Sequence, residues 1–252
     1  MAPRALNPYE SDELLAAFPE GLRPGGLALT QEALDFCQFP AQAPLVDVGC
    51  GTGVTLGYLK QKGFQVLGLD KSDKLLRLAR QRGSAQKASF ESLPLAAETV
   101  AGLFCECSLS LAQDKAQVLG ELWRCARPGG FLIISDLVSR TPRISPEPGS
   151  SQPLTCAAGA VSLKTLARLL AETGWRLRYY RDHQKALKSL AASLVWRYGS
   201  LANLGRLWPG EAVGCLGGSN LTYGLFIAQK SASGPRPLPE LIGYNQDFIL
   251  NS

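Results

Sequence analysis

The sequence contains one histidine and one methionine among its 252 residues. It also has no apolar run approaching the roughly 18 residues that a membrane-spanning helix needs. Its first residues lack the apolar core of a secretory signal peptide. We therefore expect a cytoplasmic protein that has no membrane span and few groups suited to acid–base chemistry.

Paired Cys-x-x-Cys spacing, which is typical of structural zinc, is also missing, although the chain has seven cysteines. An odd number of cysteines in a reducing compartment argues against a disulfide framework. A zinc site without that spacing would have to use Cys105, Cys107, Cys156 and Cys215. We expect no bound metal, and we expect small core residues at Cys37, Cys50 and Cys125.

The charge pattern gives no sign of a nucleic-acid partner. The net charge is +5, and the basic residues are scattered along the chain. The exception is Arg77, Arg80 and Arg82, which recur along one predicted helix and are explained by a solvated helix face. A small molecule is therefore the expected ligand class.

Hydrophobic periodicity predicts alternating strands and helices. The predicted strands are 45–48, 64–69, a weaker one near 88–91, 100–107, 131–136, 176–182 and 223–229. The predicted helices are 10–20, 28–38, 54–62, 72–82, 114–126, 162–173 and 184–207. This alternation predicts an α/β fold with helices on both faces of a sheet that is largely parallel.

The expected organisation has three parts. Residues 1–43 form an N-terminal helical cap that carries the breaker-rich loop "GLRPGG". Residues 44–230 form the main domain, with a helical insertion at about 184–207. Residues 231–252 are a linker and a tail that packs loosely or against a protein partner.

A glycine-rich loop follows the first predicted strand and opens a helix, in the stretch "LVDVGCGTG". Glycines let the backbone turn sharply and approach a ligand closely, and an acid that ends the next strand, here Asp70, can bind ribose hydroxyls. A dinucleotide fingerprint would place its third glycine at position 54, where this chain has valine. The glycine spacing therefore disfavours a dinucleotide.

This loop resembles motif I of the class I S-adenosylmethionine-dependent methyltransferases, of the UbiE or type 11 kind. "ESLPL" at 91–95 and "RPGG" followed by "FLIISD" at 127–136 extend the resemblance over roughly residues 22–182 and the last strand. It implies a Rossmann-like fold with a seven-stranded mixed sheet, an N-terminal cap over the cofactor and a helical lid. Candidate lid walls, or packing residues, are Trp196, Tyr198 and Trp208.

The resemblance implies S-adenosyl-L-methionine as cofactor. The implied cofactor-binding residues are Asp47, Gly49, Cys50, Gly51, Gly53, Asp70, Lys71, Ser89, Phe90, Glu91 and Cys105. Among these, Asp47 would organise the loop, Asp70 would bind the ribose, and Cys105 would lie near the sulfonium. Ser89 stands where many relatives have an aspartate that binds the adenine amino group, so the adenine site is weaker here.

The methyl acceptor is less defined. Methyl transfer needs alignment and needs a base only when the nucleophile carries a proton. His183, beside Asp182, is a weak candidate for such a base and is otherwise a surface or helix-start residue. Cys107 is a second weak candidate for a catalytic residue.

The stretches from Cys105 to Leu137 and from Thr155 to Trp175 resemble arsenite methyltransferases. That resemblance implies soft thiolate ligands for a metalloid at Cys156, Cys215 and Cys107. The cysteine that this family has after motif I is missing, because Val54-Thr55-Leu56 stands there. Cys105 and Cys107 could compensate if both point to one face of the strand, which would turn Glu106 to the other face. The alternative is that Cys156 and Cys215 only fill space.

We therefore predict a methyltransferase that acts on a small molecule and releases S-adenosylhomocysteine. Thiolate-assisted methylation of a metalloid such as arsenite is one alternative. A non-enzymatic sensor or partner subunit that binds the cofactor or its product is another. The sequence leaves the acceptor, the oligomeric state and the pathway open.

Overall fold

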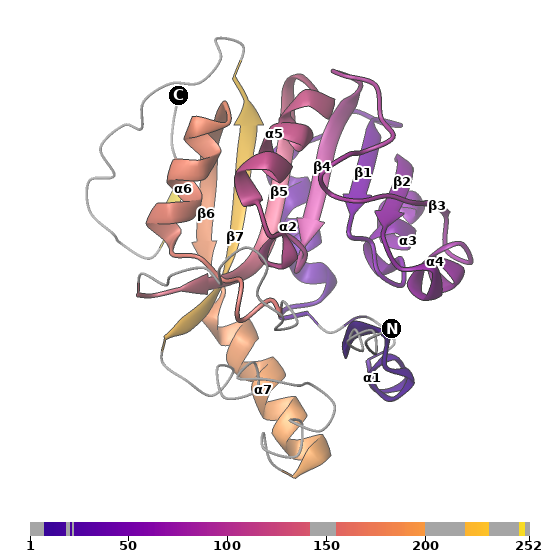
Figure 1. Cartoon of the computed structure of the whole chain (residues 1–252), viewed down its shortest axis with the longest axis vertical. Coiled ribbons are helices and arrows are strands. Elements are labelled where there is room, and N and C mark those ends of the chain that lie inside the picture. The colour runs from indigo at the N-terminus through magenta and orange to yellow at the C-terminus, as the bar shows by residue number, and fades with distance from the viewer. Residues whose placement is uncertain are drawn as a thin grey trace, which may run out of the picture.

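The computed structural model describes residues 8–18, 21, 23–141, 155–199, 220–231 and 247–249. Its centre is one sheet with the strand order β3-β2-β1-β4-β5-β7-β6-β8 (Figure 1). The strands are β1 Pro44–Val48, β2 Gln65–Asp70, β3 Ser84–Lys87, β4 Val100–Glu106, β5 Ala126–Ser139, β6 Trp175–Asp182, β7 Leu221–Lys230 and β8 Asp247–Ile249.

The pairing of these strands confirms the predicted fold. The pairs β2–β3, β1–β2, β1–β4 and β4–β5 are parallel, whereas β7 is antiparallel to both β5 and β6. These seven strands form the mixed, Rossmann-like sheet of the class I methyltransferase fold. β8 comes from the segment that we predicted to be a linker and tail, and it pairs antiparallel with β6.

Helices cover both faces of the sheet. They are α1 Asp12–Ala17, α2 Leu27–Cys37, α3 Val54–Gln61, α4 Asp73–Ala79, α5 Lys115–Cys125, α6 Leu163–Glu172 and α7 Gln184–Tyr198, with short 3-10 turns η1 at Pro8–Glu10 and η2 at Leu109–Leu111. Side chains from α5 and α6 pack on one face of the sheet, and side chains from α2 and α7 pack on the other. Figure 1 shows α5 and α6 in front of the sheet.

Side-chain alternation along the central strands creates these two cores. Leu103 and Leu132 pack on the side of α5, whereas Phe104 and Ile133 pack on the side of α2. All four side chains are fully buried. A strand that is apolar on both faces is typical of the centre of a parallel sheet, and it explains why β1, β4 and β5 are continuous hydrophobic runs in the sequence.

Polar side chains fix where several helices begin. The side chain of Ser72 accepts from the N–H of Leu75, that of Asp114 from Gln117, and that of Ser162 from Thr165. Each of these bonds satisfies an N–H that has no partner within its helix. Helices α4, α5 and α6 therefore begin within a residue of their predicted starts.

Several predicted elements differ from the structure, and the predicted helices 10–20 and 72–82 are shorter, as α1 Asp12–Ala17 and α4 Asp73–Ala79. The third strand is Ser84–Lys87, not 88–91, because an edge strand in which only Ala85 is buried gives little hydrophobic signal. The four residues 127–130 form an irregularity within β5, between the pairs Val100–Ala126 and Gly102–Phe131. Helix α7 ends at Tyr198, and the rest of the predicted insertion lies outside the described residues.

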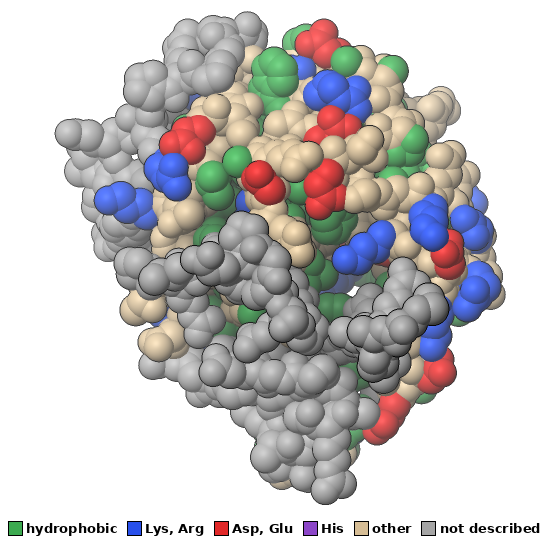
Figure 2. Space-filling model, in the orientation of Figure 1, with side chains coloured by type: hydrophobic (Ala, Val, Ile, Leu, Met, Phe, Trp, Pro, Cys, Tyr) green, Lys and Arg blue, Asp and Glu red, His purple; other side chains and the backbone are tan. Residues whose placement is uncertain are grey.

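Charged side chains of both signs lie on the visible surface of the described residues. On the face shown in Figure 2, the Lys and Arg side chains of the described residues lie among Asp and Glu side chains. Arg77, Arg80 and Arg82 are exposed as predicted, but only Arg77 lies within helix α4, which ends at Ala79. In the described part of the chain, no helix combines the length and the apolar character needed to cross a membrane.

Candidate functional site

A cavity of about 190 Å³ lies at the carboxyl ends of β1, β2 and β4. Its inner wall includes the loop Gly49–Thr52, Asp70, Phe90 and Glu106. Its outer wall comes from the N-terminal segment, where Tyr9, Leu14, Phe18 and Arg23 line it. This position, outside the carboxyl ends of neighbouring strands, is where open α/β sheets bind ligands.

The three glycines of the loop play different parts, although all adopt a positive φ of 53–80°. A Cβ on Gly51 would meet nothing within 4 Å, so this residue faces the open cavity. A Cβ on Gly49 would lie 2.6 Å from the Cβ of Ser108. Gly53 does not line the cavity, because its Cα approaches α4 so closely that a Cβ would lie 2.9 Å from the Cα of Ala79.

Asp70 holds the glycine loop in place. Its Oδ2 accepts from the N–H of Gly51 at 2.9 Å, and its Oδ1 accepts from the N–H of Ser72 at 2.8 Å. Burial raises the pKa of this carboxyl above its ordinary value. Lys71 also lines the cavity. Each carboxylate oxygen retains acceptor capacity toward a hydroxyl of a ligand.

The predicted adenine segment contributes one side chain to the cavity. Phe90 lines the wall, whereas Ser89 and Glu91 are exposed and hydrogen-bond to each other. The chain turns back on itself here through a bridge between Ser89 and Ser92. Phe90 therefore points inward and its two neighbours point outward, so Ser89 and Glu91 do not reach the cavity.

Asp47 is the last residue but one of β1 and is 3% exposed. Its Oδ2 accepts from the N–H of Leu56 at 3.0 Å, which ties β1 to the first turn of α3. Burial, reinforced by the neighbouring Glu106 carboxylate and opposed by Arg23, raises the pKa of Asp47 to about 8. The Asp47 carboxyl is therefore protonated more easily than an exposed aspartate.

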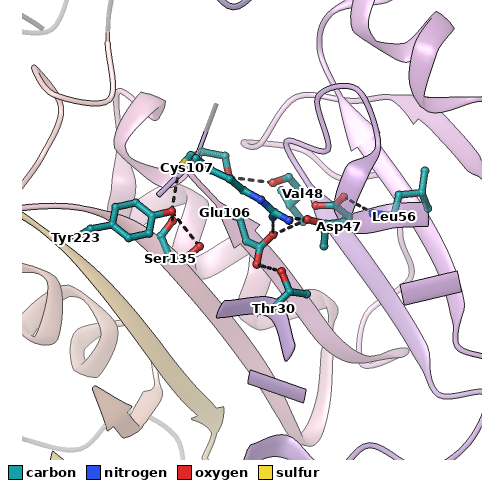
Figure 3. Close-up of polar contacts among 11 residues, drawn as sticks. Thr30, Asp47, Val48, Leu56, Glu106, Cys107, Ser135 and Tyr223 are labelled. Atoms are coloured by element: carbon teal, nitrogen blue, oxygen red, sulfur yellow. Dashed lines mark hydrogen bonds and ion pairs between the residues drawn. The ribbon is translucent and has the colours of Figure 1, made fainter. Parts of the chain in front are cut away.

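Glu106 and Arg23 form a buried ion pair that the sequence did not reveal (Figure 3). Nη1 of Arg23 donates to Oε2 of Glu106 and, at 2.6 Å, to Oγ1 of Thr55. The hydroxyls of Thr55 and Thr30 donate to Glu106 at 2.5 and 2.8 Å. Glu106 was expected to point away from the site. Its one sequence signal was a charged residue at the carboxyl end of an apolar strand.

Cys105 in β4 and Cys107 directly after it do not share one face of the sheet. Cys107 has a φ of +52°, so the strand alternation ends before it, and it lines the cavity. Its Sγ lies 2.9 Å from the hydroxyl of Tyr223. Cys105 is 1% exposed in the core on the side of α5, and its Sγ lies 3.0 Å from the Oγ of Ser108. Cys105 therefore does not line the cavity.

Cys156 lies near Cys107 and beneath the N-terminal segment. The hydroxyl of Tyr9 donates to its Sγ at 3.1 Å. Burial raises the pKa of Cys156 to about 12, and the nearby Cys156 contributes to the raised pKa of Cys107. Cys215 lies outside the described residues. Among the described residues, no group of three or more His, Cys, Asp or Glu side chains could hold a metal ion. Cys50 is buried behind the loop and lines part of the cavity.

His183 and the helix that follows it do not reach the cavity. The Nε2 of His183 lies 3.4 Å from Oε1 of Glu32. Asp182 instead accepts from the hydroxyl of Thr222 at 2.5 Å and from the N–H of Gln184 at 2.7 Å. The two neighbours therefore form no dyad. Trp196 on α7 is 90% exposed and is no pocket wall, and Trp208 lies outside the described residues.

Comparison with known proteins agrees with this geometry. Residues 46–134 match the family described as "Methyltransferase domain". An uncharacterized methyltransferase, YodH, of Bacillus subtilis is 33% identical over 129 residues, which are 48% of this chain and 55% of that protein. An arsenite methyltransferase of Halobacterium salinarum is 30% identical over 152 residues, which are 54% and 39% of the two chains. This chain thus spans less than two thirds of the length of these relatives.

Two solved structures share the fold. Haemonchus contortus phosphoethanolamine N-methyltransferase 2, in complex with S-adenosyl-L-methionine, matches with a TM-score of 0.71 at 16% identity, over 86% of this chain and 56% of the other. The [4+2]-cyclase SpnF matches with a TM-score of 0.61 at 18% identity, over 81% and 80% of the two chains. At these identities the likeness shows the fold alone.

Proposed function

We propose that this chain, whose residues 46–134 match the methyltransferase family, is a class I S-adenosylmethionine-dependent methyltransferase that transfers a methyl group from this cofactor to a small-molecule acceptor and releases S-adenosylhomocysteine. The observation that carries the proposal is the cavity at the carboxyl ends of β1, β2 and β4, with Gly51 open to it and Asp70 at its wall. The chemical class of the acceptor is also proposed, from the residues that line the cavity.

The residues around the cavity fit S-adenosyl-L-methionine. Gly51 leaves a space that a side chain would fill, so a ligand can approach the backbone there. The carboxylate of Asp70 suits ribose hydroxyls, and the ring of Phe90 suits the flat adenine base. Asp47 is a buried carboxyl that a ligand ammonium would help to ionise.

When bound, the cofactor supplies a methyl group on a positively charged sulfur, whose bonding electron pair stays on sulfur as the acceptor's lone pair forms the new bond. The protein's own contribution is alignment and exclusion of water. Leu14, Leu15 and Phe18 of the N-terminal segment cover the cavity with apolar side chains. The raised pKa values of Tyr9 and Cys107, both caused first by burial, make these two lining groups poor bases at neutral pH.

No histidine is among the residues that line the described cavity. We therefore favour an acceptor whose nucleophilic atom has a free lone pair without losing a proton, such as a neutral amine, a thioether or a trivalent metalloid. An acceptor hydroxyl would need a base, and the carboxyl groups that line the cavity, Asp47, Asp70 and Glu106, already accept hydrogen bonds within the protein. His183 is not that base in our proposal, because it binds Glu32 away from the cavity.

The experiment is to incubate the full chain with S-adenosylmethionine labelled on the methyl group and with amine, thioether, hydroxyl and carboxylate acceptors. Formation of S-adenosylhomocysteine together with a labelled product from one acceptor class supports the proposal. Tight cofactor binding without turnover on any class would contradict it and would favour a non-enzymatic binding protein.

Methylation of a trivalent metalloid is the second candidate, and the observation that favours it is the pair Cys107 and Cys156. Cys107 lines the cavity, and the thiol of Cys156 accepts a hydrogen bond from Tyr9, which lines the same cavity. Soft thiolates suit a soft centre such as arsenic(III). Arsenite should then raise the yield of S-adenosylhomocysteine in the wild type and in Cys105→Ala, but not in Cys107→Ser or Cys156→Ser. Equal yields in all four proteins would exclude this acceptor.

A further inference from the structure

Helix α7 carries the two most exposed large apolar side chains among the described residues. Trp196 is 90% exposed and Val195 is 37% exposed. In the described part of the chain, Leu78 on α4 is the only other large apolar residue that is exposed. The opposite face of α7 is buried against the protein. The helix therefore turns a tryptophan toward solvent from its outer face.

The same outer face is basic. Lys185 lies three residues before Lys188, and Lys188 lies two steps of four residues before Trp196, so the three side chains share one side of the helix. Both lysines are exposed, and neither has an ion-pair partner among the described residues. The stretch 183–210 contains no aspartate or glutamate, although the whole chain has 21 acidic residues. α7 therefore presents positive charge that no acid within this stretch neutralises.

An exposed tryptophan beside lysines on a convex helix matches a membrane surface better than a protein surface. Helices that lie in the membrane interface combine basic residues with tryptophan, whose ring sits at the level of the headgroups. Anionic headgroups attract lysines that lie close to them. Protein–protein interfaces, in contrast, are depleted in lysine. A second copy of this chain would bring two positively charged faces together, which is unfavourable.

α7 also lies beside the segment that covers the cavity. The guanidinium carbon of Arg197 lies 5.9 Å from the centre of the Phe18 ring, and Phe18 lines the cavity. Near the start of α7, a Cβ on Gly25 would lie 3.5 Å from the Cβ of Ala186. Figure 1 shows α7 extending beyond the sheet at the bottom of the view. A surface that α7 binds would therefore lie next to the outer wall of the cavity.

We infer that the outer face of α7 docks on an anionic phospholipid surface, with Trp196 in the headgroup region and with Lys185 and Lys188 against the negatively charged headgroups. The docking rests on α7 alone and does not depend on the proposed function. One consequence does rest on the proposed function, namely that the methyl acceptor is a molecule held in the membrane.

The test is co-sedimentation of the full chain with phospholipid vesicles at low salt. One set of vesicles contains phosphatidylcholine alone, and the other contains equal parts of phosphatidylcholine and phosphatidylserine. We expect the wild type to bind the anionic vesicles only. Trp196→Ser should weaken this binding about 5- to 20-fold, and Lys185→Gln/Lys188→Gln should weaken it about 10- to 30-fold. Raising the salt concentration should weaken the binding of the wild type, because salt screens the lysines.

Matched variants separate this face from general charge and apolar area. Leu78→Ser removes an exposed apolar side chain from α4, and Lys60→Gln/Lys62→Gln removes two exposed lysines from the end of α3. Both control variants should bind the anionic vesicles as the wild type does. All the side chains that are changed are exposed, so urea unfolding should give the same midpoint in every variant.

Three outcomes would overturn the inference. The first is a wild type that does not bind the anionic vesicles, and the second is a pair of α7 variants that bind no more weakly than the controls. The third is binding to poly-glutamate without binding to the vesicles, which would favour an acidic protein as the partner. None of these measurements uses S-adenosylhomocysteine, so a failure of the docking is read separately from a failure of the proposed function.

Discussion

Gly51 and Gly53 are two residues apart, share a left-handed backbone and should respond to alanine in opposite ways. The φ values are +53° and +80°. A Cβ on Gly51 would point into open space, and a Cβ on Gly53 would lie 2.9 Å from the backbone of Ala79. We therefore expect Gly51→Ala to impair binding and Gly53→Ala to impair folding.

The magnitudes follow from this geometry. The left-handed conformation costs an L-residue about 1–2 kcal/mol, and the lower entropy of the unfolded alanine chain offsets about 0.5–1 kcal/mol of that cost. Gly51→Ala should thus lower the free energy of unfolding by about 1 kcal/mol. In Gly53→Ala, overlap with α4 adds about 1–3 kcal/mol, which gives a total of about 2–4 kcal/mol.

The binding effect is reversed. A methyl group on Gly51 occupies the space where a ligand would approach the loop, so affinity for S-adenosylhomocysteine should fall by about 10- to 100-fold, equivalent to the about 1–3 kcal/mol of an overpacked contact. The folded fraction of Gly53→Ala should bind within a few-fold of the wild type.

The assay is urea unfolding and calorimetric titration on the same preparations. Gly120→Ala is the matched control, because Gly120 lies in helix α5 and a Cβ there meets nothing within 4 Å. In this variant the free energy of unfolding should rise by about 0.5–1 kcal/mol, and the binding affinity should not change. Wild-type affinity in Gly51→Ala, or equal stability of the two loop variants, would refute this division of roles.

Three further predictions follow from the same structure. The pKa of Asp47 is raised from its ordinary value to about 8, so the folded state binds this proton more tightly than the unfolded chain does. The free energy of unfolding should therefore decline as pH rises from about 4 to about 8, and in urea unfolding the Asp47→Asn variant should show a shallower decline. His183→Gln should leave S-adenosylhomocysteine affinity and methyl transfer unchanged, because His183 contacts Glu32 and does not line the cavity; a loss of turnover with normal affinity would restore His183 as a catalytic candidate. Burial raises the pKa of the Cys105 thiol to about 12 and that of the Cys107 thiol well above its ordinary value, so neither forms the reactive thiolate readily at neutral pH. Mass spectrometry should find both cysteines unmodified after brief iodoacetamide treatment of the native protein, and modified after denaturation.

Much of the fold could be predicted because the central strands are apolar on both faces. Such runs as Phe131–Asp136 stand out in the sequence, although β5 already begins at Ala126, before the breaker "RPGG". Strand β3 was misplaced because it lies at the edge of the sheet with only Ala85 buried. β8 was missed because its pairing with β6 is a long-range contact that no local pattern encodes.

The candidate site was predictable where it is local in the chain. Gly51 lies in the loop after β1 and Asp70 is the last residue of β2, and a hydrogen bond joins them in the structure. The pair Arg23–Glu106 joins residues 83 positions apart, so no spacing rule could reveal it. Strand alternation also failed at Cys107, because β4 ends at Glu106 and the left-handed backbone of Cys107 is no longer extended.

Calorimetric titration of the wild-type chain with S-adenosylhomocysteine tests the central claim most directly. A cavity that holds the cofactor through Asp70, the glycine loop and the buried carboxyl of Asp47 predicts one molecule bound per chain, with a dissociation constant on the order of micromolar, about −8 kcal/mol. A folded chain that releases no heat of binding at millimolar ligand, and shows no shift of its unfolding transition, would contradict the account.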